Sequence, residues 1–278
     1  MRKLLLSLSL VFCFTMLVSA QESEREKGTV TKNDRLILPQ AGDFAIGVDA
    51  DPFFRYMGNF FHGNTVNSAP TFGGLTIYGK YFLENDRALR VKLLVDFSST
   101  TEKANVPNNA STVPGATVED SWKHSNGDIG LSVGYEIRRG YGRLQGFYGA
   151  EVGLGYTSSK DTYEYGNAYS TTNPTPTFTN FNGNDLGAAR ILTDKTNGGF
   201  NADLGVFVGV EYFVAPKLSI GAEVGLGLGF ASNGKTKLTT ESWTGTAVEK
   251  NDTDGFAGAG SFDFGTRHGG NIFVLFHF

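Results

Sequence analysis

The stretch from Phe200 to Phe230 constrains the fold of this chain more than any other part of it. It reads FNADLGVFVGVEYF, then VAPK, then LSIGAEVGLGLGF, and in both arms the even-numbered residues are apolar or aromatic while the odd-numbered ones are mostly small or charged. A two-residue period is that of a β-strand whose two faces meet different surroundings. The stretch therefore predicts two antiparallel strands joined by a tight turn.

The length of the two arms favours a membrane over water. Each arm keeps its alternation for about thirteen residues, whereas soluble strands usually run five or six and a membrane-spanning strand needs about 9 to 11. A long hairpin in a soluble β-protein is the alternative. It also buries one apolar face, but it has no need for arms of this length with aromatic residues near both ends.

The first twenty residues have the pattern of a secretory signal peptide. Arg2 and Lys3 precede an apolar run, and Val18-Ser19-Ala20 supplies the small residues of a cleavage site. A transmembrane anchor is the less favoured alternative, because the apolar run is short and interrupted by serines. Phe12 before Cys13 argues against a lipoprotein signal. Residues 21–41, which are highly charged, are expected to be a flexible periplasmic segment, and 42–278 a single outer-membrane domain.

Composition excludes several classes of protein. Without residues 1–20 the net charge is about −6, which argues against nucleic acid as a partner. Cys13 is the only cysteine, so the remaining chain has no disulfide, no thiolate nucleophile and no cysteine metal site. No long apolar run follows residue 20, which excludes a helical membrane protein. A barrel is not excluded, because only alternate residues of its strands face lipid.

The same alternation recurs along the chain and predicts eight strands. They are expected at 42–50, 72–83, 89–97, 128–137, 144–156, 200–212, 218–230 and 271–278. The connections alternate between short turns and long polar loops, the loops being 51–70, 98–126, 158–199 and 231–267. The fold class is therefore predicted as all-β, a transmembrane antiparallel up-and-down β-barrel of eight strands with short periplasmic turns and long extracellular loops.

Aromatic residues are predicted to mark the two membrane interfaces, where rings tolerate the headgroup region. One girdle is expected at Tyr81, Tyr135, Tyr148, Tyr212, Phe276 and Phe278, and the other at Phe72, Phe97, Tyr156, Phe200 and Phe230. With an even number of strands, both termini lie on the periplasmic side.

These features resemble the small eight-stranded outer-membrane barrels of the OmpA and OmpX type, and particularly the outer-membrane β-barrel proteins of Bacteroidetes. The resemblance covers about residues 42–278, including the opening GDFAIGVDADPFFRYMGNFF and a last strand that ends in Phe278. It implies a cell outer membrane location, contact with outer-membrane lipid and lipopolysaccharide, and recognition of Phe278 by the barrel-assembly machinery. OmpA itself continues into a peptidoglycan-binding domain, so no cell-wall anchoring is expected here.

Charged residues fall on the predicted inward face. They are Lys80, Arg90 and Lys92 with Asp49, Asp96, Asp128, Glu136, Glu151, Asp203, Glu211 and Glu223. An eight-stranded barrel is only wide enough to be filled by side chains, so these charges are expected to pair with one another or to bind water. A narrow conducting path is the alternative. Inward glycines such as Gly225, Gly227 and Gly229 are expected to make room for large neighbours, since no P-loop lysine follows them.

The sequence predicts no catalytic residue, no cofactor site and no metal site, because it contains neither an HExxH motif nor a nucleophile elbow. His62, His124 and His268 fall in the external loops or at their bases, and a rim enzyme acting on lipid A or peptide is therefore an alternative. The loops also hold aromatic residues among Thr and Asn, namely Tyr163, Tyr165, Tyr169, Phe178, Phe181, Trp243 and Phe256. We expect a non-enzymatic structural or adhesive protein that recognises a host protein or glycan through these loops.

Overall fold

The computed structural model describes residues 36–50 and 75–278, and these residues form one antiparallel sheet of ten strands. The strands are β1 Phe44–Asp49, β2 Leu75–Glu84, β3 Arg87–Pro107, β4 Thr117–Tyr141, β5 Leu144–Glu164, β6 Ala189–Ala215, β7 Leu218–Asn233, β8 Thr236–Trp243, β9 Val248–Asp254 and β10 Ala259–His277. In this part of the chain no helix is long and apolar enough to cross a membrane. The predicted signal peptide and first external loop lie outside the described residues.

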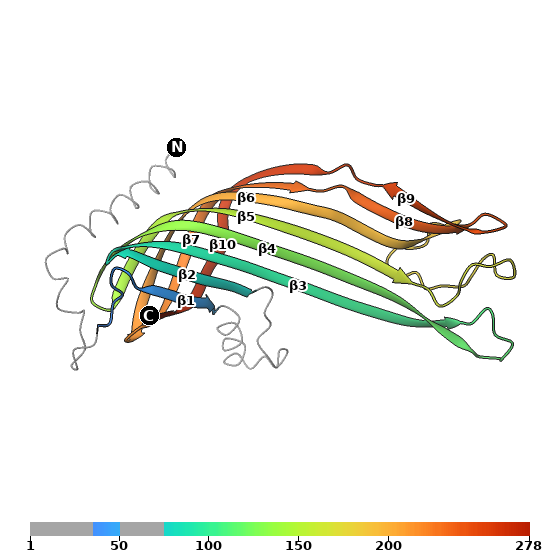
Figure 1. Ribbon diagram of the computed structural model, residues 1–278, viewed down its shortest axis with the longest axis horizontal. Helices are drawn as coiled ribbons and strands as arrows, with labels where there is room; N and C mark the ends of the chain where they lie inside the picture. Colours follow the sequence, from blue (N-terminus) through green and yellow to red (C-terminus); the bar gives the residue numbers. More distant parts are fainter. Residues whose placement is uncertain (1–35, 51–74) are drawn as a thin grey trace, which may run out of the picture.

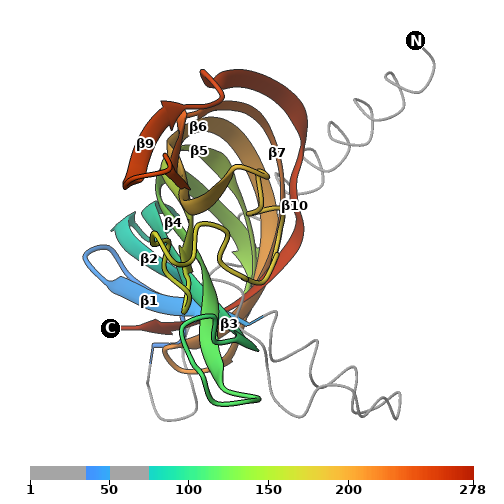
Figure 2. The same ribbon diagram turned by 90° about the vertical axis from the view of Figure 1, so that its right-hand side faces the viewer.

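The strand pairings form a closed ring. β1 to β7 pair in chain order, and β10 pairs with both β7 and β1. The strands curve around a common interior, with β1 beside the end of β10 (Figure 2). β8 and β9 stand outside the ring: β8 pairs with the first part of β6, and β9 pairs with β8. Each strand of the ring therefore has a hydrogen-bonded neighbour on both sides, which leaves no open sheet edge there.

The inward and outward faces predicted for residues 200–230 are confirmed. On β6 the side chains of Leu204, Val206 and Val208 are exposed on the outside, whereas Phe207 and Phe213 are buried within the ring. Exposed apolar side chains continue around all the strands of the ring, as a band far larger than the apolar patches that soluble monomers tolerate. Such a band requires hydrocarbon rather than water around it.

Two groups of exposed aromatic residues flank this band. One lies at the end with the short turns and contains Phe44, Tyr81, Tyr135, Tyr148, Tyr212, Phe276 and Phe278. The other contains Phe97, Tyr156, Phe200, Phe230, Phe262 and Phe264, which we call the outer aromatic band. Phe72, predicted as a member of it, lies outside the described residues. The remaining predicted girdle residues are confirmed as exposed.

The loop prediction for 98–126 is wrong over most of its length, and the prediction for 158–199 is wrong at both ends, where β5 continues to Glu164 and β6 begins at Ala189. The ladder between β3 and β4 runs without a break from Arg87 opposite Ile137 to Pro107 opposite Thr117. Figure 1 shows β3 to β6 continuing together far beyond the ends of β1 and β2. Residues 231–267, also predicted as a loop, hold the end of β7, all of β8 and β9, and much of β10. We call residues 98–126 and 157–199 with β8 and β9 the strand extension.

The physical reason is that the strand extension is mostly polar on both faces, and its buried apolar side chains, such as Val106, Tyr163 and Ile191, are too scattered to give a hydrophobic period. Its ladders are built from main-chain hydrogen bonds, which do not depend on side-chain polarity, and from cross-strand pairs such as Lys103 Nζ to Glu119 Oε1 at 2.7 Å. A strand that buries neither face in an apolar environment has no hydrophobic period. The three short turns, in contrast, fall within the connections that the sequence predicts, although β4 continues to Tyr141 and shortens the second of them.

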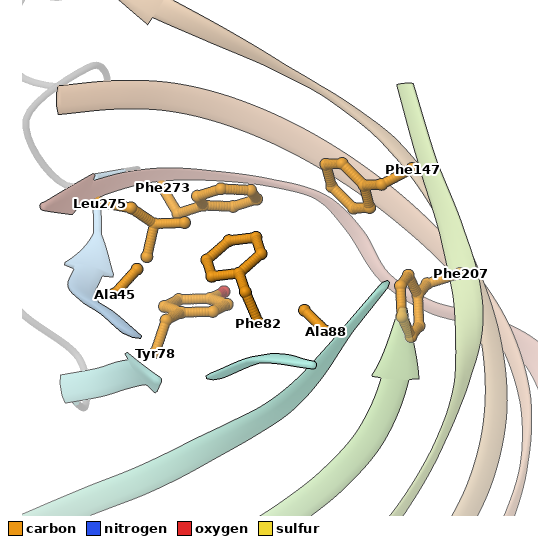
Figure 3. Packing of buried hydrophobic residues seen from close by; sticks show 8 residues of the cluster. All are labelled: Ala45, Tyr78, Phe82, Ala88, Phe147, Phe207, Phe273 and Leu275. Carbon is orange, nitrogen blue, oxygen red and sulfur yellow. The ribbon is translucent and has the colours of Figure 1, made fainter. Parts of the chain in front are cut away.

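The interior near the short turns is packed with aromatic rings. The buried cluster comprises Ala45, Tyr78, Phe82, Ala88, Phe147, Phe207, Phe273 and Leu275 (Figure 3). Glycines on neighbouring strands accommodate these rings, since a Cβ at Gly209 would overlap the Phe147 ring and a Cβ at Gly221 would overlap the Phe273 ring. The role expected of inward glycines also holds at Gly229, which makes room for the Asp263 carboxylate.

We predict that Gly221→Ala destabilises the protein by about 1–3 kcal/mol, because the fully buried Phe273 ring has no space to move aside. The matched control is Gly265→Ala, since a Cβ there meets nothing within 4 Å. Equilibrium unfolding by urea in detergent micelles measures both variants. An equal loss of stability in the two variants contradicts this account of the packing.

Candidate functional site

The inward charges converge on a single ion-pair network inside the ring. Lys80 on β2 donates to Glu136 on β4 at 3.0 Å and to Glu211 on β6 at 3.1 Å. Arg138 on β4 donates to the same two carboxylates at 3.0 and 2.9 Å. All four side chains are at most 2% exposed. Two cations and two carboxylates therefore neutralise one another across the width of the ring.

A second set of charges continues the network towards the strand extension. Glu223 on β7 accepts from Arg90 Nη2 and from Lys92 Nζ, both at 2.7 Å. Lys92 also donates to Glu151 at 3.1 Å, and Arg90 lies 3.5 Å from Glu136, which joins the two sets. The pairing predicted for the inward lysines and Arg90 with the inward glutamates is confirmed. Buried ions are tolerable only when they are paired in this way.

Arg138 is the member of the network that the sequence prediction missed. The run Arg138-Arg139-Gly140-Tyr141-Gly142 has the composition of a turn, but β4 continues to Tyr141 and the turn begins after it. Arg138 can be recognised by its even residue number, because the even-numbered residues of this strand, such as Glu136, face inward. His277 also joins the network, with Nε2 at 3.1 Å from Glu211 and 2.9 Å from Ser219 Oγ.

Aromatic rings fill the space around these charges. The Lys80 ammonium lies 4.7 Å from the centre of the Phe147 ring, and the Arg90 guanidinium lies 3.9 Å from that of Phe207. Such cation–π contacts add attraction where water is excluded. Since Phe82, Phe147 and Phe273 are at most 1% exposed, side chains occupy the interior at this level.

Beyond the network the interior becomes polar and open. Asp96 on β3 and Asp128 on β4 lie directly opposite each other and line a hollow of about 290 Å³ at the start of the strand extension. The other residues around the hollow are Ser98, Asn126, Thr157, Ser158, Ser159, Thr196, Gly199 and Asn233. Asp49 and Asp203, also predicted to face inward, do not line it. Among the described residues no group of three or more His, Cys, Asp and Glu is arranged to hold a metal ion.

The concave face of the strand extension carries a hydrogen-bonded cluster centred on Asp161. Its carboxylate accepts from Trp122 Nε1 and from His124 Nδ1, both at 2.7 Å. With Nδ1 donating to Asp161, His124 Nε2 accepts from Asn126 Nδ2 at 2.9 Å. Asp194 lies directly opposite Asp161, and burial together with this neighbouring charge raises the pKa of Asp194.

Of the three histidines predicted at the outer rim, only His124 has a described side chain. His62 lies outside the described residues, and His268 lies on β10 where the side chain is not described.

Residues 165–188, between β5 and β6, form an ordered cap with a small core of their own. The guanidinium of the buried Arg190 lies 4.0 Å from the Tyr165 ring centre and 4.7 Å from that of Tyr169, and its Nε donates to Glu241 at 2.8 Å. Burial raises the pKa of Tyr165 to about 12. Asp120 on β4 accepts from two main-chain N–H groups of this cap, at 2.7 and 2.8 Å.

The loop aromatic residues therefore divide into two groups. Tyr163, Tyr165, Tyr169, Phe178 and Phe181 contact other rings or Arg190 inside the extension rather than standing free on its surface. Phe256, by contrast, is 62% exposed.

The tip of the β3–β4 hairpin is tied to this cap. Asn109 accepts from the Thr177 main-chain N–H at 2.8 Å, and its own N–H donates to Asn167 Oδ1 at 3.0 Å. Asn167 in turn donates to the main-chain oxygen of Pro107 at 2.8 Å. The strand extension is thus a folded, mutually supported unit and not a set of independent loops.

A closed antiparallel ring with an apolar outer face, a charge-filled interior and two aromatic bands defines an outer-membrane β-barrel. Residues 64–230 match the model of a family described as the putative OmpA-OmpF-like porin family. This match covers more than half of the sequence, and the chain belongs to that family.

The crystal structure of the outer membrane protein OprG from Pseudomonas aeruginosa is also similar to this chain. It shares 13% identity over 87% of this chain and 98% of its own, with a TM-score of 0.33. No curated protein matches the sequence.

We predict that Glu211→Gln destabilises the protein by about 3–5 kcal/mol, because it leaves Lys80 and Arg138 buried with one carboxylate between them. Glu119→Gln is the matched control, since its pair with Lys103 is about half exposed and therefore screened by solvent. Urea unfolding in detergent micelles compares the variants. A Glu211→Gln variant as stable as the control contradicts a structural role for the network.

Proposed function

We propose that this protein is an integral outer-membrane barrel with a surface-recognition role, carried by the strand extension and not by an enzymatic site. The eight strands β1 to β7 and β10 form the wall that spans the membrane. The three short turns and both termini lie on the periplasmic side, and the strand extension projects outside the cell. A cleaved signal peptide directs the chain there, and the assembly machinery recognises the last strand ending in Phe278, whose ring stacks on Phe44 at 5.0 Å.

The observation that carries this proposal is the order of the strand extension. A barrel that only spans the membrane has no need for paired strands far beyond its apolar band, yet the β3–β4 ladder continues to Pro107 and Thr117. The cap at residues 165–188 and the hydrogen bonds around Asn109 hold the far end in one arrangement. A preorganised surface binds a partner at a lower entropic cost than mobile loops do.

The β8–β9 hairpin is the part of the extension best placed for contact with a host protein or glycan. Every residue of β9 is exposed, and among residues 36–50 and 75–278 β9 pairs on one side only, with β8. Phe256, just beyond β9, exposes its ring, and Trp243 ends β8. An exposed strand edge together with aromatic side chains provides main-chain hydrogen bonds and apolar contacts for a partner.

Two alternatives follow from particular observations. A narrow pore is compatible with the name of the family, but the charge network and the rings of Phe147 and Phe273 favour a closed interior. The alternative of a rim enzyme acting on lipid A or peptide is suggested by the hydrogen-bonded pair of His124 and Asp161. Both ring nitrogens of His124 are occupied by protein partners in this arrangement, which favours a structural role for it.

Deleting residues 235–257 tests the recognition surface. Asn233 pairs with Ala259, so joining Gly234 to Gly258 leaves a two-residue Gly-Gly turn between β7 and β10, a favoured hairpin connection. We expect this variant to insert in vesicles and to migrate differently in heated and unheated gel samples, as the wild type does, while binding to a panel of glycans and matrix proteins falls at least about tenfold. Undiminished binding refutes a role for the β8–β9 hairpin.

Planar-bilayer recording separates the closed barrel from the narrow pore. We expect the wild type to show no discrete conductance steps, because fully buried ion pairs and rings occupy the interior. Single-channel steps from protein that is folded by the gel criterion establish the pore alternative instead.

A further inference from the structure

A row of lysines crosses the outward face of the strand extension. Lys160 on β5 lies directly opposite Lys195 on β6, and Lys195 lies directly opposite Lys237 on β8. All three side chains are exposed. Lys123 on β4 is also exposed, two residues along from Ser125, which is the residue opposite Lys160. We call Lys123, Lys160 and Lys195 the lysine row. Lys237 is left out of it because its ammonium group pairs with Asp252.

The ladder register establishes which way these side chains face. On β5 the even-numbered Val152, Leu154 and Tyr156 are exposed on the outside, and the β4–β5 ladder continues without a shift to Glu164. Lys160 therefore lies on the same outward face as Tyr156. This face is continuous with the apolar band of the barrel wall.

A β-bulge is what brings Lys195 to this face. The β5–β6 register shifts between Thr157 and Ser159, where β6 has one additional residue. Before the bulge the outward residues of β6 are even-numbered, and beyond it they are odd-numbered. The bulge thus places Lys195 beside Lys160 on the outside and Asp194 beside Asp161 on the concave side. A β-bulge has this effect because its additional residue shifts the two-residue alternation, so that the side chains beyond it exchange faces.

Like charges directly opposite each other in a sheet are destabilising unless something neutralises them. Lys237 has a carboxylate partner, since its Nζ lies 2.7 Å from Asp252. Lys160 and Lys195 have no carboxylate within ion-pair distance in the part of the chain that the structure describes. Two adjacent ammonium groups without a protein counter-charge present a site for an anion.

The height of the lysine row identifies the anion. Tyr156 and Phe200 contact each other edge to face at 5.1 Å and belong to the outer aromatic band. Lys160 is four residues further along β5, roughly 13 Å at about 3.3 Å per residue. For a strand tilted by about 40° this is roughly 10 Å above the band. The headgroup layer, roughly 5–8 Å thick on each side of the membrane, lies between the aromatic band and this height, and the flexible lysine stems extend back into it.

We propose that the lysine row binds the phosphate groups of lipid headgroups in the outer leaflet around the barrel. Cβ atoms of directly opposite residues are about 5 Å apart, so the ammonium groups of Lys160 and Lys195 reach one phosphate together. The inference rests on the membrane placement under Proposed function and adds to it a defined lipid site. It also explains why the bulge separates the lysines from the aspartates on the opposite face.

The test uses the full chain folded in detergent and lipid A as the probe. Native mass spectrometry measures retained lipid A for the wild type, for Lys160→Gln with Lys195→Gln, and for a matched control of Lys103→Gln with Lys250→Gln. One lysine near an anionic surface contributes about fivefold, so we expect the first double variant to bind on the order of tenfold or more weakly. The control and a Lys160→Arg, Lys195→Arg variant retain wild-type binding.

Two further arms identify the source of the phosphate. Lipid A stripped of its phosphate groups is expected to bind the wild type as weakly as intact lipid A binds the glutamine variant, and inorganic phosphate is expected to compete poorly. Equal retention by wild type and glutamine variant, equal retention of both lipids, or full competition by inorganic phosphate overturns the proposal.

Failure of the wild type to insert in vesicles and shift on heating refutes the membrane placement itself. Both lysines are exposed, so the variants are expected to pass that folding criterion, and Lys160→Gln alone repeats the comparison with less disturbance.

Discussion

Closure of the backbone hydrogen-bond ladder is the constraint on which the rest of this structure depends. In hydrocarbon an unpaired N–H or C=O group costs several kcal/mol, so a membrane-spanning sheet has to meet itself. β10 achieves this by pairing with β7 along one edge and with β1 along the other. Once the ring is closed, each strand has one face towards lipid and one towards a narrow interior. The apolar band, the aromatic bands and the buried charges all follow from that division.

The interior of the ring and the strand extension are held together by different interactions. Inside the ring, Lys80 and Arg138 are held between Glu136 and Glu211, and aromatic rings occupy the space around them. This packing makes the ring a rigid support. Beyond the outer aromatic band the same strands carry polar residues on both faces, and the Arg190 cage and the Asn109 bonds hold their far end. A rigid base with an ordered polar projection is the arrangement on which the proposed recognition role rests.

Sequence reasoning succeeded where the two faces of a strand meet different surroundings. In β6, Leu204 and Val206 alternate with Asp203 and Gly205, and the faces they occupy follow from that alternation alone. It failed where both faces are polar: residues 98–107 have no hydrophobic period, yet they continue β3. Arg138 lies in a run whose glycines, Gly140 and Gly142, indicate a turn, yet it belongs to β4. Most of the loop aromatic residues pack against one another, although their composition is typical of a binding surface. Composition reports which residue types are present and not what each one touches.

The sequence by itself determined the class of protein, because the long alternation from Phe200 to Phe230 and its counterparts specify a wall with hydrocarbon on one side. It also identified most of the charges that face inward, though not Arg138. Only the tertiary structure decided which of these charges meet, since Lys80 and Glu211 are 131 residues apart and their contact depends on the register of every ladder between them. The same holds for Lys160 and Lys195. Their shared outward face depends on one additional residue in β6, and only the pairing of β6 with β5 reveals that bulge.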